Sequence, residues 1–200
     1  MAPTMLHDLD RSLEALLRAY ADPALLEQTS ITFATPGSNF PPQGVTLPAL
    51  NLFLYDVQEN HEYRGGASEW HKRDDGTLFR PPAPVRVDCH YLVTAWAAEG
   101  APTPDQDEHH LLGAALVVLL RFRELPAAVL RGALVASERP VRARTQAAHR
   151  LGELWSALGG TPRPAFNYTA TIALAVHAEE EGGTSPGNVQ VNFNPRPRTP

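Results

Sequence analysis

Alternation of apolar and polar residues marks the central part of this chain. In residues 85–96 the odd positions are apolar, while Arg86, Asp88, His90 and Thr94 occupy even positions. This period of two is typical of a half-buried β-strand. Residues 50–57 are more continuously apolar, as expected of a strand that is covered on both faces. The two runs therefore predict a long antiparallel pair, separated by a polar, solvent-facing excursion.

Apolar periodicity predicts the remaining elements. Apolar residues recur every three or four positions from Leu6 to Tyr20, which predicts an amphipathic helix that ends at Asp22-Pro23. A helix over residues 105–122 is apolar nearly all round and is therefore expected to be well buried. The other predicted elements are a helix over 146–158 and strands over 31–33 and 166–176, and residues 130–135 and 141–145 are predicted to be two short strands or extended segments.

These elements predict a mixed α/β fold, with one mixed, mainly antiparallel sheet and about three flanking helices. The fold is expected to occupy residues 1–178 as one domain, because a chain of 200 residues is of ordinary single-domain size. Glycine and proline become frequent in residues 179–200, which predicts a flexible C-terminal arm.

The centre of the arm has the pattern of a strand. Residues 188–193 alternate between polar and apolar side chains, the apolar ones being Val189, Val191 and Phe193. This strand has two candidate partners, its own sheet or the sheet of a neighbouring molecule. The glycine-rich tether before it gives reach and favours the neighbour.

Composition limits the classes of function. The formal net charge of −5 argues against general nucleic-acid binding, because such binding relies on Lys and Arg. One cysteine excludes an internal disulfide. The first residues lack the pattern of a secretory signal, and no uncharged apolar stretch reaches the length of about 18 residues of a membrane span. We therefore expect a cytoplasmic protein without direct membrane insertion.

Candidate catalytic and metal-binding residues have simpler structural explanations. His109 and His110 follow several acidic residues, but adjacent helical positions point about 100° apart, and an acidic first turn explains the cluster. Cys89 lies within a predicted strand, which favours a buried structural cysteine over a nucleophile. No common catalytic or phosphate-binding motif is present. We expect no enzyme activity, no cofactor and no metal.

The polar excursion between the two long strands mixes charges with aromatic residues. A solvated hairpin that turns at residues 74–76 explains most of this composition. The alternative is a protein-contact surface, because exposed Trp, Tyr and Arg anchor many interfaces. The candidate contact residues are Tyr63, Arg64, Trp70, Lys72 and Arg73 in the excursion, together with the three apolar residues of the arm.

The order of these segments resembles the N-terminal-domain family of the cap, or tail terminator, proteins of phage-tail-like contractile injection systems. The most specific matching segments are Asn-Leu-Phe-Leu-Tyr-Asp at 51–56 and Tyr-Leu-Val-Thr-Ala-Trp at 91–96. Further matches are Ile31-Thr32-Phe33, Glu59-Asn60, Arg64, Arg80-Pro81-Pro82, Glu108, Leu111-Leu112-Gly113, Leu154-Trp155 and Leu158. The resemblance covers residues 5–178, and the short arm leaves little room for the extra domain that some relatives carry.

This resemblance implies a fold similar to phage tail terminators, assembled as a sixfold ring. The ring would terminate the inner tube, contact the last sheath layer and hold the sheath extended. The implied partners are further copies of the chain, the inner tube protein and the sheath protein, within an assembled injection particle.

Two alternatives remain from the sequence. A small α/β enzyme would require titratable groups clustered in a pocket. A monomeric adaptor or chaperone, for assembly or cargo of the same system, would share the contact surfaces but would not self-assemble.

Overall fold

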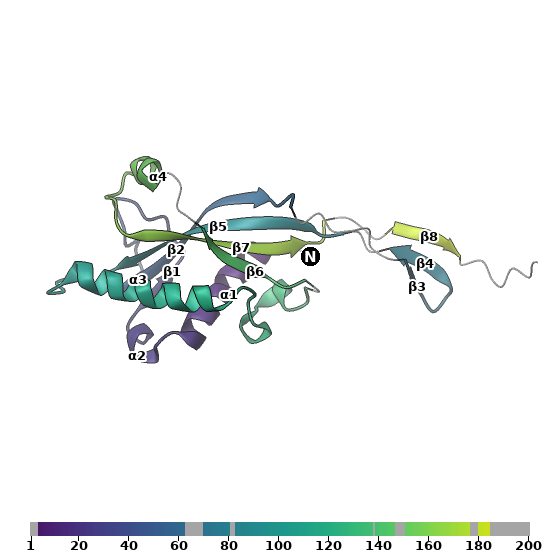
Figure 1. Cartoon of the computed structure of the whole chain (residues 1–200), viewed down its shortest axis with the longest axis horizontal. Helices are drawn as coiled ribbons and strands as arrows, with labels where there is room; N and C mark the ends of the chain where they lie inside the picture. The colour runs from purple at the N-terminus through teal and green to yellow at the C-terminus, as the bar shows by residue number, and fades with distance from the viewer. Residues whose placement is uncertain are drawn as a thin grey trace, which may run out of the picture. The chain divides into compact units, whose positions relative to one another are not determined.

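Figure 1 shows the computed structural model of the chain. It describes residues 4–62, 70–80, 83–137, 139–146 and 151–176, and the backbone of residues 180–184. The chain forms two compact units. The first unit comprises Met1–Arg64 and Val85–Leu174, and the second comprises Gly65–Pro84 and Ala175–Pro200.

The first unit is built on a five-stranded sheet. Its strands, in spatial order, are β1 (Ser30–Thr32), β2 (Ala49–Glu59), β5 (Val85–Trp96), β7 (Ala165–Leu174) and β6 (Arg142–Gln146). β1 is parallel to β2, and every other neighbouring pair is antiparallel. The structure confirms the predicted mixed, mainly antiparallel sheet and the predicted pairing of β2 with β5.

Helices lie on both sides of this sheet. The helical elements are α1 (Met5–Tyr20), α2 (Pro23–Leu26), α3 (Pro104–Arg121), η1 (Ala127–Val129), η2 (Gly132–Leu134) and α4 (Leu151–Leu158). α1 and α3 lie on one side of the sheet and α4 on the other (Figure 1). The predicted strand over 130–135 was wrong, because short 3₁₀ turns occupy that segment.

The N-terminal helix packs as its apolar stripe predicts. Leu9, Leu13 and Leu16 of α1 are fully buried and belong to the main core. Asp8 is also buried, and its carboxylate accepts hydrogen bonds from the Thr4 hydroxyl at 2.7 Å and from the Ala133 N–H at 3.0 Å. Gly132 has a φ of 54° and leaves no space for a Cβ beside Asp8. This glycine therefore allows the segment that contains η2 to approach α1 closely.

Both faces of β5 are buried over much of its length. Cys89, Tyr91 and Val93 point into the main core. The opposite face was predicted to face solvent, but Asp88 is only 7% exposed and Thr94 is fully buried. The prediction was wrong because both polar side chains have hydrogen-bond partners, Asp88 on neighbouring segments and Thr94 in the indole N–H of Trp96 on the same strand, so polarity does not require exposure here.

Asp88 joins four segments of the sheet. Its carboxylate accepts hydrogen bonds from the Thr171 hydroxyl on β7 at 2.5 Å and from the Asn60 Nδ2, just after β2, at 2.9 Å. The guanidinium of Arg144 on β6 lies 3.0 Å from the same carboxylate. Since Asp88 itself lies on β5, one buried charge connects β2, β5, β7 and β6.

A second cluster holds the end of β5 to the start of α3. The Arg163 guanidinium lies 3.3 Å from the centre of the Trp96 ring and 3.0 Å from the Glu108 carboxylate. Phe40 stacks on Trp96 with 4.0 Å between ring centres. Glu108 also accepts a hydrogen bond from the Ala97 N–H at 3.3 Å. These contacts fix the first turns of α3 and the loop before it.

The second unit contains a small sheet of three strands, which are β3 (His71–Lys72), β4 (Thr77–Arg80) and β8 (Glu180–Thr184). β3 and β4 form the predicted hairpin, and β8 pairs antiparallel with β4. The sequence did not predict β8, because Glu-Glu-Gly-Gly-Thr has low strand propensity. The predicted boundary at residue 178 stays a prediction.

We predict that Asp88→Ala lowers the free energy of unfolding by about 3 kcal/mol, because it leaves the buried polar groups around it without their acceptor. Urea unfolding measures this loss. The matched control is Glu14→Ala, which removes an exposed carboxylate paired with Arg18 at 3.1 Å. Its expected cost is below about 0.5 kcal/mol. Equal losses in the two variants would contradict a central role for Asp88.

We also predict opposite pH dependences for two carboxyls of α1. The hydrogen bonds from Thr4 and then Ala133 lower the pKa of Asp8 below 3.8. Burial raises the pKa of Asp10 above 3.8, although the Tyr91 hydroxyl donates to it at 2.7 Å. Asp8 therefore stabilises the fold above pH 3.8 and loses this effect as the pH falls through its lowered pKa. The contribution of Asp10 to the stability of the fold becomes less favourable as the pH rises from 3.8 through its raised pKa.

The test compares urea unfolding of the wild type, Asp8→Asn and Asp10→Asn between about pH 3 and pH 6. The stability advantage of the wild type over Asp8→Asn should shrink on acidification below 3.8. Its stability relative to Asp10→Asn should instead improve as the pH is lowered towards 3.8. Parallel curves for the three proteins would contradict this account.

Candidate protein-contact surfaces

The predicted contact residues that the structure describes in the hairpin lie at its surface. Trp70 is 49% exposed, and the Arg80 guanidinium lies 5.3 Å from the centre of its ring. Lys72 is exposed on β3, and Arg73 lies over the Phe79 ring at 4.7 Å. The hairpin thus presents an aromatic ring beside cationic side chains. This is a composition found at the centre of many protein interfaces.

The turn of the hairpin is the one that the sequence predicts. Gly76 has a φ of 86°, and its N–H donates to the Arg73 carbonyl at 3.0 Å. The Asp75 carboxylate accepts hydrogen bonds from the hydroxyl and the N–H of Thr77, which hold its pKa below the ordinary value. The hydrogen-bonded turn brings Lys72 opposite Leu78 and thereby sets the register of the hairpin.

The other predicted contact residues are Tyr63, Arg64, Val189, Val191 and Phe193. They lie outside the residues that the structure describes. Their contact role therefore stays a prediction. β8, which precedes the segment 188–193, shows that part of the glycine-rich region pairs with β4.

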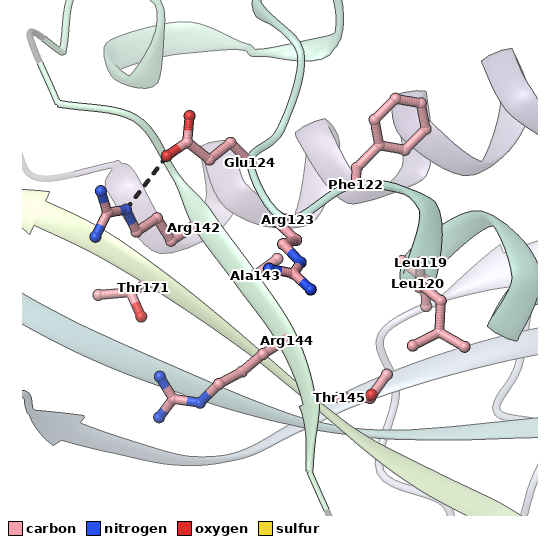
Figure 2. A pocket seen from close by; sticks show the side chains of 10 residues that line it. All are labelled: Leu119, Leu120, Phe122, Arg123, Glu124, Arg142, Ala143, Arg144, Thr145 and Thr171. Atoms are coloured by element: carbon pink, nitrogen blue, oxygen red, sulfur yellow. Dashed lines mark hydrogen bonds and ion pairs between the residues drawn. The ribbon is translucent and has the colours of Figure 1, made fainter.

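A groove in the first unit was not predicted. It has a volume of about 630 Å³ and lies between the end of α3 and the outer edge of β6. Figure 2 shows the guanidinium of Arg123 between the Glu124–Arg142 ion pair and the apolar side chains at the end of α3. Its described lining residues are Leu119, Leu120, Phe122, Arg123, Glu124, Arg142, Ala143, Arg144, Thr145 and Thr171.

Backbone hydrogen bonds fix the floor of this groove. The Ala143 N–H donates to the Arg123 carbonyl at 2.8 Å, and the Leu125 N–H donates to the Val141 carbonyl at 2.9 Å. The segment after α3 is thereby attached to the edge of β6. Glu124 reaches across to Arg142, with 3.3 Å between carboxylate and guanidinium. The groove is a built feature of the edge of the sheet, with apolar and cationic walls.

The outer face of α3 beside the groove is apolar and exposed. Val117 is 59% exposed and Leu120 is 55% exposed, whereas Leu111, Val118 and Leu119 of the same helix are buried. The prediction that the whole helix is well buried was therefore wrong. The sequence did not show this division, because apolar residues occupy both the buried and the exposed positions of the helix.

Cys89, His109 and His110 are the residues that the sequence offered as candidates for catalysis or metal binding. Burial, with smaller effects of Asp88 and Asp10, raises the pKa of the Cys89 thiol to about 12, so this thiol is not a thiolate at neutral pH. His109 and His110 are exposed on α3. Within the described residues, no three His, Cys, Asp or Glu side chains gather as metal ligands would. The described helices include none that is long and apolar enough to span a membrane.

Comparison with known proteins identifies relatives of the whole described fold. The family profile of the Pvc16 N-terminal domain matches residues 8–187. A solved structure of the sheath/tube terminator of an extracellular contractile injection system, PVC, in the extended state, has a TM-score of 0.68 at 22% identity. The cap of the anti-feeding prophage, a tube-terminating cap, has a TM-score of 0.58 at 23% identity.

These likenesses extend over nearly all of this chain but not over all of the relatives. They cover 98% and 96% of this chain, and 65% and 61% of the terminator and cap chains respectively. This chain therefore spans less than two thirds of the length of either protein. A search of curated proteins finds no match.

Proposed function

This chain belongs to the Pvc16 N-terminal domain family, and we propose that it is a structural cap of a contractile injection system. In this proposal six copies form a ring that terminates the inner tube and contacts the last layer of the sheath. The observation that carries the proposal is the family match over residues 8–187. The shared fold with a sheath/tube terminator and a tube-terminating cap supports it.

Exposed apolar surface supports an assembled state. Val117 and Leu120 are both more than half exposed on the outer face of α3, and Leu120 also borders a groove. These two side chains lie one helical turn apart, and exposed apolar residues that lie together commonly mark an interface. A ring would cover this face in every copy.

The hairpin and the arm are the proposed contacts with other components. Trp70, Lys72 and Arg73 give the hairpin an exposed aromatic and cationic surface. The alternating segment 188–193 suits addition to the edge of a neighbouring sheet, where backbone hydrogen bonds supply affinity and side chains choose the register. We propose that both contact other components of the particle, and the sheath is the partner tested below.

The proposed role is structural and not enzymatic. The described lining of the groove contains arginines, one glutamate paired with Arg142, threonines and apolar residues. It contains no cysteine, histidine or lysine among the described residues. The groove therefore lacks the usual paired nucleophile and base.

A monomeric adaptor or chaperone of the same system is the second candidate. It would use the same hairpin and arm, but it would neither self-assemble nor bind tube ends. Self-assembly is the property that separates the two functions.

We predict that the purified chain forms a hexamer, either alone or after addition of the inner tube protein. Light scattering measures the mass in both conditions. A chain cut after Thr184 retains β8 and should still form the ring, because all described strands remain. It should bind extended sheath more weakly, because the arm strand is missing. A strict monomer that ignores tube ends would contradict the cap and favour the adaptor.

We further predict that Trp70→Ala and Lys72→Glu each weaken binding to extended sheath by about tenfold, which is typical of a residue that anchors an interface. Both side chains are exposed, so the free energy of unfolding should change by less than about 0.5 kcal/mol. Co-sedimentation with sheath measures binding. Arg11→Glu changes an exposed cation on α1 and serves as the control. Unchanged binding in both hairpin variants would remove the hairpin from the sheath contact.

A further inference from the structure

Charge is distributed unequally between the two ends of α3. Residues 121–146, from the last residue of the helix to the end of β6, contain six arginines and two glutamates in a chain of net charge −5. Three of these arginines line the groove, namely Arg123, Arg142, which pairs with Glu124, and Arg144, which pairs with Asp88. Residues 99–108, at the opposite end, contain four acidic residues and no lysine or arginine. The 18 residues of α3 separate these ends by about 27 Å. The helix therefore has one acidic and one basic end.

The charges at both ends are available for contact. Arg121 and Arg123 are exposed, and the structure gives neither an ion pair within the described residues. Glu99, Asp105 and Asp107 are exposed at the other end. Glu108 differs from these acids, because it is partly buried and paired with Arg163 at 3.0 Å. The internal pair therefore anchors the acidic end and leaves the other three carboxylates facing outward.

Apolar residues accompany the charges at both ends. The basic end is a groove with Leu120 and Phe122 in its wall. The acidic end is an exposed loop, residues 98–104, in which alanines and prolines accompany Glu99 and Gly100 has a φ of 72°. A loop with apolar and acidic side chains is chemically complementary to a groove with apolar and cationic walls. The distance between the ends prevents this contact within one molecule, so the occupant is a second copy.

We propose that the groove beside Arg121 and Arg123 binds the acidic loop and first turn of α3, residues 98–107, of the next copy in the ring. Each copy then offers one basic groove and one acidic loop, so the contact is heterologous and repeats from copy to copy until the ring closes. Opposite charges steer the two ends together and disfavour groove-to-groove contact. Val117 and Leu120 are covered at the same contact. This inference rests on the proposed ring and names its subunit interface.

Charge reversal at each end tests the interface. Arg121→Glu with Arg123→Glu reverses the two exposed arginines at the C-terminal end of α3, of which Arg123 lines the groove. Asp105→Arg with Asp107→Arg reverses the charge of the first turn of α3. Each doubly substituted protein should fail to form the ring, with self-association weakened by about a hundredfold or more. Native mass spectrometry and light scattering measure the assemblies, with tube protein present if the wild type requires it. Arg11→Glu with Arg18→Glu makes, on α1, the same change in net charge as the double arginine variant and should leave the ring intact.

Mixing gives the decisive result. In a mixture of the two reversed proteins, every groove meets a loop of opposite charge when the copies alternate. A ring of six, being even-numbered, should therefore return with equal amounts of each protein. A single chain that carries all four substitutions should also form the ring, because both surfaces are reversed together. A mixture that stays unassembled, or reversed proteins that each form rings alone, would overturn the interface.

Two further measurements distinguish loss of the interface from loss of the fold. Positive charge near the start of α3 opposes the helix dipole, so thermal unfolding of every variant is measured first. Glu99 lies outside the helix, so the substitution Glu99→Arg should weaken the ring without affecting the fold. A wild-type chain that never self-associates would overturn both the ring and its interface. A wild-type ring that is insensitive to all charge reversals would overturn the interface alone.

Discussion

A single buried carboxylate determines how the main sheet fits together. Asp88 is the acceptor for Thr171, Asn60 and Arg144, and these three residues come from three other segments of the sheet. An ionised carboxylate is costly to bury unless it is paired and hydrogen-bonded, so these contacts favour the register in which all the segments meet. Together with the ladder between β6 and β7, they hold β6 at the edge of the sheet. The groove and its arginines depend on that position.

The helix α3 serves the core and the surface at the same time. Val118 and Leu119 are buried in the core, while Val117 and Leu120, their immediate neighbours, are exposed. A monomer gains nothing from apolar side chains in water, but a component of an assembly contributes them to an interface. The same helix thus connects the stability of the domain with the surface that we assign to self-assembly.

Local periodicity predicted the elements whose surroundings are simple. The stripe of α1, the alternation of β5 and the turn at Gly76 each follow from a few neighbouring residues. Burial of Asp88 could not be predicted, because its partners are distant in sequence. The 3₁₀ turns at 127–134 were missed because apolar runs of a few residues suit strands equally well. The groove was missed because it requires the end of α3 and the edge of β6 to meet.

The proposed cap benefits from modest contacts between its copies. The exposed apolar side chains on α3 are few, and the charges at the proposed interface are exposed in the monomer and therefore screened by salt. Each contact alone is then weak enough to keep free copies from forming stray assemblies. When copies gather on a tube end, neighbouring contacts become intramolecular and act at a high effective concentration. In the proposed cap, the ring would then close on the tube end, where the copies are held together.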